Sequence, residues 1–327
     1  MWFKNLRVYR LPASFEIDAE TLHEKLMAHV FTPCGKSQED SFGWIPPILD
    51  EGSEFVHVAN GCIMVCGKRQ DKLLPASVVR EELEERAVQI AEREGRRIGR
   101  KERAQMRDEI RLDLLPKAFV RSKVHYAYFA PKQGWLLLDA ASDKQAEEFL
   151  ESLRDALGSL PVVPLTTKSQ PVNMMTQWVK QSSAPGTLDL GEDCELRDPL
   201  SESSVIRCKH QDLQSDDIIN HVNAGMEVSK LALIWNGGIE CLVDDKFNIK
   251  RLRFADEIHE QADEVEADGA AQKFDIEFSV MTIEIEAFLK QLIEAFGGVD
   301  TSLDKHEKPA SSSPVVASPN ELETAAI

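Results

Sequence analysis

Short stretches in which apolar and polar residues alternate predict several β-strands. The first is residues 2–11, WFKNLRVYRL. Two apolar runs within residues 54–67 meet at Asn60-Gly61, a dipeptide typical of a tight hairpin turn. Further strands, joined in part by Gly-containing turns, are expected at residues 123–130, 135–140, 203–213, 228–235, 239–243 and 249–254.

Other stretches repeat their apolar residues every three or four positions, which predicts helices. Asp18 is a good N-cap for a helix that carries Leu22 and Leu26. Ser142 and Gln145 have the spacing of a capping box, and Gly158 ends the helix that follows. Further helices are expected at residues 175–180, 216–223 and 282–296, and the acid-rich residues 256–268 are expected to form a solvated helical face or a loop.

This mixture of strands and helices predicts an α+β fold built from two mixed sheet/helix units. The proline-rich segment LPVVPL, residues 160–165, suits an extended edge or a linker. We therefore expect an N-terminal unit, residues 1–165, and a C-terminal unit with an antiparallel meander, residues 166–299. Residues 300–327 are rich in Pro and Ser without periodicity, so we expect a disordered tail there.

Residues 77–119 contain a long helical pattern that is interrupted by two glycines. We expect Ser77 to cap its start, with acidic residues in the first turns and arginines later, as the helix dipole favours. Gly95 and Gly99 would each cost about 1 kcal/mol relative to alanine inside a continuous helix. The pattern therefore favours an antiparallel helical hairpin, with its tip near residues 95–101, over one unbroken helix.

The charge of this hairpin is opposite to that of the whole chain. The chain carries a formal charge of −18, whereas residues 93–111 hold eight cations and four acids and are therefore at about +4. A hairpin would crowd six of the cations at one projecting end: Arg93, Arg96, Arg97, Arg100, Lys101 and Arg103. Concentrated positive charge would suit a polyanion, although the same pattern is also typical of a solvated face with weak local ion pairs.

Composition narrows the function classes further. No apolar run is long enough to span a membrane and the N-terminus lacks a hydrophobic signal region, so we expect a cytosolic protein. The six cysteines lack metal-ligand spacing, which favours reduced thiols and no metal site. The GKS at residues 35–37 lacks the glycine and the preceding strand of a phosphate-binding loop. No cofactor is expected.

Several segments, in order through the chain, resemble the bacterial recombination-associated protein RdgC family. The resemblance runs from residue 2 to about residue 298. The segments that carry it are WFKNLRVYRL, FTPCG with GWIPP, HVANG, LLPKAF, LGSLPVVPL, VIRCKHQDL, and KLALIWNGGIECLVDD with KRLRFADE.

The resemblance implies a non-enzymatic DNA-binding protein without catalytic residues. It implies a ring-shaped homodimer that encircles duplex DNA, limits the access of RecA in recombination and replication-fork repair, and associates with the nucleoid. Single-stranded DNA stays open as a partner. The family's projecting finger is similar to residues 77 to about 115.

Single residues also match the family's functional positions. Phe119 is similar to an aromatic residue at the contact between subunits, although an ordinary core aromatic is an alternative. Lys209, His210 and Gln211 match a basic DNA-binding segment, in which a histidine stands at position 210 where we expect lysine in relatives. Neutral histidine would weaken a contact with phosphate.

Two functions from other classes compete with this interpretation. One is a protein-binding regulator that contacts RecA directly through the acidic surface. The other is a metal-dependent nuclease, which needs carboxylates that converge on a cation. The carboxylates considered for such a site are Asp244, Asp245, Asp256 and Glu257.

Overall fold

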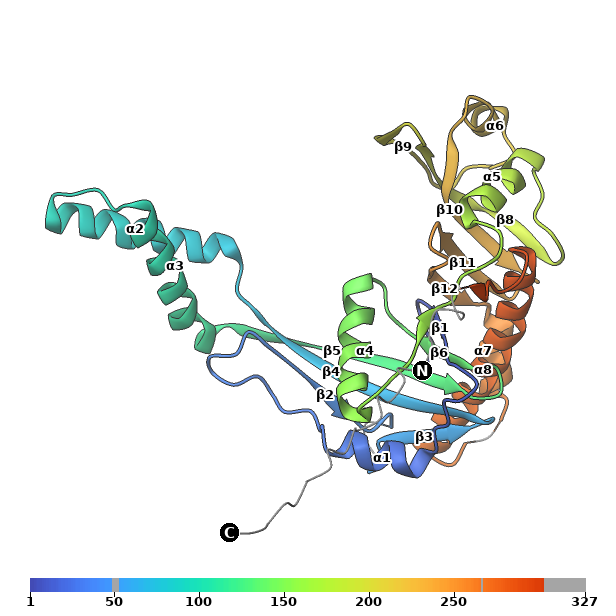
Figure 1. Ribbon diagram of the computed structural model, residues 1–327, viewed down its shortest axis with the longest axis horizontal. Helices are drawn as coiled ribbons and strands as arrows, with labels where there is room; N and C mark the ends of the chain where they lie inside the picture. Colours follow the sequence, from blue (N-terminus) through green and yellow to red (C-terminus); the bar gives the residue numbers. More distant parts are fainter. Residues whose placement is uncertain (49–52, 266, 303–327) are drawn as a thin grey trace, which may run out of the picture.

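The computed structural model describes residues 1–48, 53–265 and 267–302, which form a mixed α+β fold with two antiparallel sheets (Figure 1). The α+β class predicted from the sequence is therefore confirmed. The first sheet has the order β2-β4-β5-β6-β1-β7, and β3 pairs with β4 off this path. Its strands are β1 (Arg7–Arg10), β2 (Asp40–Ile45), β3 (Val56–Ala59), β4 (Cys62–Leu73), β5 (Phe119–Ala130), β6 (Trp135–Leu138) and β7 (Val163–Pro164).

Strands β4 and β5 are long and form the middle of this sheet. They pair without interruption from Ile63 opposite Phe129 to Leu73 opposite Phe119. The turn before β4 has positive φ at both Asn60 and Gly61, which is the geometry that an Asn-Gly hairpin turn requires. Helices α1 (Ala19–Met27) and α4 (Asp143–Leu157) share one buried apolar cluster with the first sheet. Asp18 and Ser142 cap these two helices, as predicted.

Between β4 and β5 the chain forms α2 (Ala76–Glu94) and α3 (Arg100–Leu114), followed by a 3₁₀ turn, η1 (Leu115–Lys117). Helix α2 ends at Gly95, which has the left-handed φ of 66°. The predicted cap at Ser77 is wrong, because α2 begins at Ala76 with Pro75 at the N-cap. Figure 1 shows α2 and α3 beyond one end of β4 and β5, away from the other helices.

The second sheet has the order β12-β11-β10-β8-β9, so that, among the described strands, β9 is an edge strand paired with β8 alone. Its strands are β8 (Leu188–Asp198), β9 (Ser201–Cys208), β10 (Glu227–Trp235), β11 (Ile239–Asp244) and β12 (Ile249–Phe254). The remaining helices of the described residues are α5 (Pro171–Gln181), α6 (Asp216–Asn223), α7 (Asp256–Asp263) and α8 (Ala270–Ala295). None of the helices in the described part of the chain is long and apolar enough to cross a membrane.

One buried cluster joins the two sheets. It contains Met64 and Tyr128 from the first sheet, Leu231 from the second, and Phe278 and Phe288 from α8. The backbones also meet, since Leu6 and Ile249 form an isolated antiparallel bridge. The segment at residues 160–165 lies at the edge of the first sheet, where β7 pairs with β1. A division into separate units near residue 165 stays a prediction.

Some elements differ from the sequence-based expectations. The strand expected at residues 2–11 is only Arg7–Arg10, because Trp2 and Phe3 turn into the core instead of continuing a ladder. Helix α8 begins at Ala270, earlier than expected, and β8 was not predicted at all. The expected strand at 203–213 ends at Cys208. Of the tail expected to be disordered, residues 303–327 lie outside the described residues.

Candidate nucleic-acid interface

Some cations of α2 and α3 are neutralised by neighbouring carboxylates. Arg96 donates two hydrogen bonds of 2.8 Å to Glu102, and its Nε lies 2.9 Å from Glu94. Arg93 also pairs with Glu94 at 2.9 Å, and Arg103 contacts Glu84 at 2.7 Å. Hydrogen bonds from Arg93 and Arg96 lower the pKa of Glu94 below its ordinary value. These three arginines therefore carry less charge that is free to attract an anion.

Four other cations within residues 93–111 have no such partner. Within the described chain, no carboxylate pairs with Arg97, Arg100, Lys101 or Arg107, and all four side chains are exposed. Arg100 and Lys101 are the first two residues of α3, where the helix dipole adds positive potential. An anion that approached this end would meet backbone N–H groups as well as the two cations.

Three of these four cations, Arg97, Arg100 and Arg107, lie along a groove on the α2–α3 pair. Two adjoining depressions of about 540 and 570 Å³ share Glu84, Arg103 and Arg107 in their walls. The complete set of arginines along the groove is Arg80, Arg97, Arg100, Arg103, Arg107 and Arg111. Arg80 was missed in the sequence analysis because it stands among acids. Val79 and Leu83 of α2 pack on Ile110 of α3, and Arg80 lines the same depression as Arg107 and Arg111 of α3.

Phe119 lies where β5 leaves η1 and is 83% exposed. The alternative of a core aromatic is therefore wrong within this single chain. Its strand partner Leu73 and its neighbour Val120 are also exposed, as is Leu112 on α3. Phe119 and Leu73, which are directly opposed in the ladder, form an exposed apolar pair at the junction between α2–α3 and the first sheet.

Lys209, His210 and Gln211 follow β9 and are all exposed. His210 has a left-handed φ of 52°, and its N–H donates to Asp193 at 3.1 Å, while the N–H of Gln211 donates to the Glu192 carbonyl at 3.0 Å. Although burial opposes the shift, the bond from His210 and the ion pair with Arg251 lower the pKa of Asp193. Figure 1 shows β9 well apart from α2 and α3, so one chain does not bring the two predicted cation groups together.

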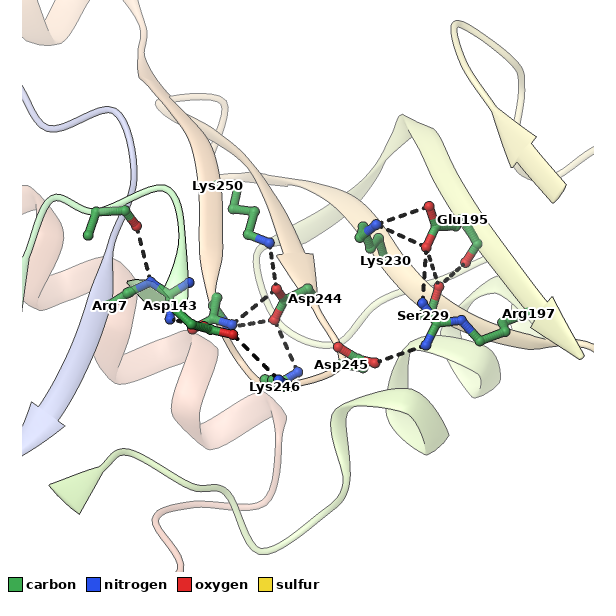
Figure 2. A network of polar contacts seen from close by, with 12 residues as sticks. Arg7, Asp143, Glu195, Arg197, Ser229, Lys230, Asp244, Asp245, Lys246 and Lys250 are labelled. Carbon is green, nitrogen blue, oxygen red and sulfur yellow. Dashed lines mark hydrogen bonds and ion pairs between the residues drawn. The ribbon is translucent and has the colours of Figure 1, made fainter. Parts of the chain in front are cut away.

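The second sheet also carries cations, and its two buried carboxylates, Glu195 and Asp244, hold several of them (Figure 2). Glu195 accepts hydrogen bonds from Arg207 at 2.9 Å, Lys230 at 2.9 Å and Ser229 at 3.0 Å. Although burial opposes the shift, these donors lower the pKa of Glu195 to about 2. Arg197 lies 3.5 Å from Glu195 and 3.6 Å from Asp245, so it bridges the two carboxylates.

The carboxylates of the nuclease alternative are not gathered into one site. Asp244 accepts from the backbone N–H of Lys246 and of Asn248, and pairs with Lys250 at 2.9 Å, so it shapes the turn between β11 and β12 (Figure 2). Asp256 and Glu257 instead form the first turn of α7. Across the described residues there is no group of three or more His, Cys, Asp or Glu side chains that could hold a metal ion.

Comparisons with known proteins give the chain a family. A family model described as "Putative exonuclease, RdgC" matches residues 1–299. The chain is 39% identical over 298 residues to a protein named Recombination-associated protein RdgC from Tolumonas auensis, which covers 91% of this chain and 99% of that protein. A protein of the same name from Aeromonas hydrophila is 38% identical and covers 93% of this chain and 100% of its own length. Another, from Halorhodospira halophila, is 40% identical and covers 91% of this chain and 98% of its own length. The chain therefore belongs to the RdgC family.

Proposed function

We propose that this protein binds duplex DNA without sequence preference, as a ring-shaped homodimer whose α2–α3 pair is a projecting finger. In this proposal it limits the access of RecA to DNA during recombination and replication-fork repair. The observation that carries the proposal is the set of exposed, unpaired cations on α2–α3, in a chain with a formal charge of −18. The names of the relatives support a role in recombination.

Phosphate contact explains why such a protein would not select a sequence. Arg97, Arg100 and Arg107 offer planar guanidinium groups, which pair well with phosphate oxygens. Each phosphate that a cation neutralises releases counterions, so affinity falls as salt rises. If the dimer contacts about six phosphates, the slope of log affinity against log salt would be about −5.

The proposed dimer explains how a strongly acidic chain tolerates DNA. A ring would direct the cations of α2–α3 inward and leave most of the acidic surface outward, so that the local field at the DNA would be positive. Phe119, 83% exposed beside Leu73 and Val120, supports a contact between identical subunits at this junction. Closure through a second interface would complete the ring.

The dimer is tested by sedimentation of the free protein and of its Phe119→Arg variant, with and without duplex DNA. We expect the wild-type mass to be that of two chains and the variant to shift toward one, because a buried cation would replace an apolar anchor. The variant's unfolding curve serves as the control for folding. A wild-type monomer at micromolar concentration would contradict the ring.

Charge reversal on the finger tests the DNA contact itself. We expect Arg97→Glu/Arg100→Glu to weaken duplex binding at least about tenfold, and to make the salt slope shallower by about 2, because two phosphate contacts are lost. The matched control is Lys180→Glu/Lys290→Glu, which makes the same charge change at exposed residues of α5 and α8. Equal losses in the two variants would indicate a nonspecific charge effect and would remove the finger from the mechanism.

The role of RecA is tested by competition for DNA. If the protein acts by occupying DNA, excess duplex relieves its inhibition of RecA-dependent strand exchange. Inhibition that persists with excess DNA would instead favour direct contact between the two proteins. Binding to linear and to covalently closed duplex separately tests the ring, since a closed circle offers no end for threading.

A further inference from the structure

Two cysteines lie opposite one another on β8 and β9. The antiparallel register pairs Cys194 with Cys208, and the next pair, Glu195 and Arg207, is joined by a 2.9 Å contact on the other face. Directly opposed residues of an antiparallel pair have Cβ atoms about 4.5–5.5 Å apart, close to the roughly 3.5–4.5 Å that a disulfide needs. Both thiols are free.

This arrangement is particular to one pair of the six free cysteines. Cys62 and Cys66 lie on the same strand, and Cys241 faces Leu233. Cys34 lies outside the strands and contacts Gln70. No other two cysteines face one another across a ladder of the described strands, so neighbouring residues would have to move before any other disulfide could form.

Small oxidants could reach this pair from solvent. Cys208 is half-buried at the end of the edge strand β9. Cys194 is 3% exposed, and burial together with the neighbouring Cys208 raises its pKa to about 12. Cys208 is therefore the sulfur that meets an oxidant first, and Cys194 is the one that resolves the product.

We propose that Cys194 and Cys208 form a reversible redox modification site, at which a peroxide converts the two thiols to an intramolecular disulfide. The Cys208 thiolate attacks a peroxide oxygen and becomes a sulfenic acid, releasing hydroxide from hydrogen peroxide. The sulfur of Cys194 then attacks the sulfenic sulfur, loses its proton and expels hydroxide. In sum, two thiols and one hydrogen peroxide give one disulfide and two waters, and a dithiol reductant reverses the change.

The disulfide would fix the end of an edge strand. Strand β9 pairs only with β8, and Cys208 is its last residue before Lys209, His210 and Gln211. A covalent bond to β8 would hold this junction closed when the β8–β9 ladder opens. The inference rests on the geometry of the two thiols and does not require the protein to bind DNA. The redox site and the proposed DNA binding can therefore fail independently.

The site is tested by peptide mapping of the full chain after treatment with hydrogen peroxide and blocking of free thiols with N-ethylmaleimide. Trypsin would release Cys194 in residues 181–197 and Cys208 in the dipeptide 208–209. We expect these two peptides to be joined, about 2 Da below the sum of their masses, and to separate after dithiothreitol. Amide exchange of β9 is expected to slow in the oxidised protein.

Two variants decide between this site and other cysteine chemistry. Cys208→Ser should abolish the joined peptide, whereas Cys34→Ser, which removes another half-buried thiol, should leave it unchanged. Oxidation of glutathione in a parallel tube confirms the dose of peroxide. The proposal is overturned if Cys194 and Cys208 are then both blocked by N-ethylmaleimide, if Cys208 stops at a sulfinic acid, or if either cysteine is joined to another partner.

Discussion

The α2–α3 pair and the second sheet both concentrate cations, but they differ in what holds those cations in place. On the second sheet, Lys230 and Arg207 converge on the buried carboxylate of Glu195. On α2–α3, Arg97 and Arg107 are exposed and have no carboxylate partner within the described residues. Positive residues in a sequence therefore separate into two roles only when the carboxylates around them are known.

The two regions also differ in their cores. The second sheet belongs to the large cluster that includes Phe278, Phe288 and Phe296 of the C-terminal segment. The α2–α3 pair has a small cluster of its own, with Val79, Leu83 and Ile110 as its fully buried members. We therefore expect α2–α3 to open locally at a lower free energy than the sheets.

The largest expected effect is on this small cluster. Ile110→Ala removes a fully buried side chain and should cost α2–α3 about 3 kcal/mol, enough to unfold the pair locally. Hydrogen exchange should become fast across α2 and α3 while the second sheet keeps its protection. Exposed Leu112→Ala, on the same helix, is the matched control. Loss of protection in both regions would contradict two separately stabilised parts.

The next effect is on the anchored cations of the second sheet. Glu195→Gln leaves Lys230 and Arg207 without their anion and should lower the free energy of unfolding by about 2 kcal/mol. This loss is smaller than for a fully buried ion pair, because the Arg207 side chain is mostly exposed. Glu94→Gln, which removes an exposed carboxylate from Arg96, should have no measurable effect. Urea unfolding measures both, and equal changes would contradict the distinction.

The same carboxylate gives a dependence on pH. The pKa of Glu195 is lowered from 4.5 to about 2 in the folded protein, so its contribution is fully present above pH 4.5 and is lost as pH falls toward 2. Between pH 6 and pH 3, the wild type should therefore lose more stability than Glu195→Gln. Parallel curves for the two proteins would show that Glu195 is not held in its charged form.

A smaller effect is expected from releasing a paired arginine of the groove. Glu84→Gln frees Arg103 from its 2.7 Å ion pair, which should raise affinity for duplex DNA about threefold and make the salt slope steeper by up to about 1. Asp217→Asn on α6 makes the same charge change far from the groove and should have little effect. Unchanged affinity in Glu84→Gln would show that Arg103 does not reach the DNA.

The last prediction is that no catalytic activity on DNA is detected. Because Asp244 is committed to its turn and Asp256 to the start of α7, we expect no degradation of end-labelled linear duplex with magnesium or manganese. Release of nucleotides that Asp244→Asn abolishes would overturn this and support the exonuclease in the description of the family model.

Local signals were the ones that sequence alone could identify. Asn60-Gly61, Asp18 and Gly95 act through their own backbone, so the hairpin turn, the first helix and the end of α2 were predicted. Strand β8 was missed because its acids argue against a buried strand. The cations that donate hydrogen bonds to Glu195, Arg207 and Lys230, come from other strands. Trp2 was wrongly assigned to a strand. Its position is determined by contacts with Phe254 and His259, which are far away in the sequence and meet Trp2 only in the folded chain.

The candidate site shows the same limit. Sequence identified the cations of residues 93–111 but could not tell which of them are paired. Arg96 and Arg103 are held by Glu102 and Glu84, across the turn and across the helix pair, whereas their neighbours Arg97 and Arg100 are not. Such sorting depends on distances between helices, which spacing along one chain does not determine.

Photo-cross-linking tests the contact between DNA and the finger most directly. A benzophenone side chain is placed at position 101 at the start of α3 or, in separate proteins, at position 180 on α5, and each is irradiated with labelled duplex of mixed sequence. The account predicts strong cross-linking from position 101 that salt abolishes, and little from position 180. Cross-linking from position 180 with none from position 101, in proteins that still bind duplex, would contradict it.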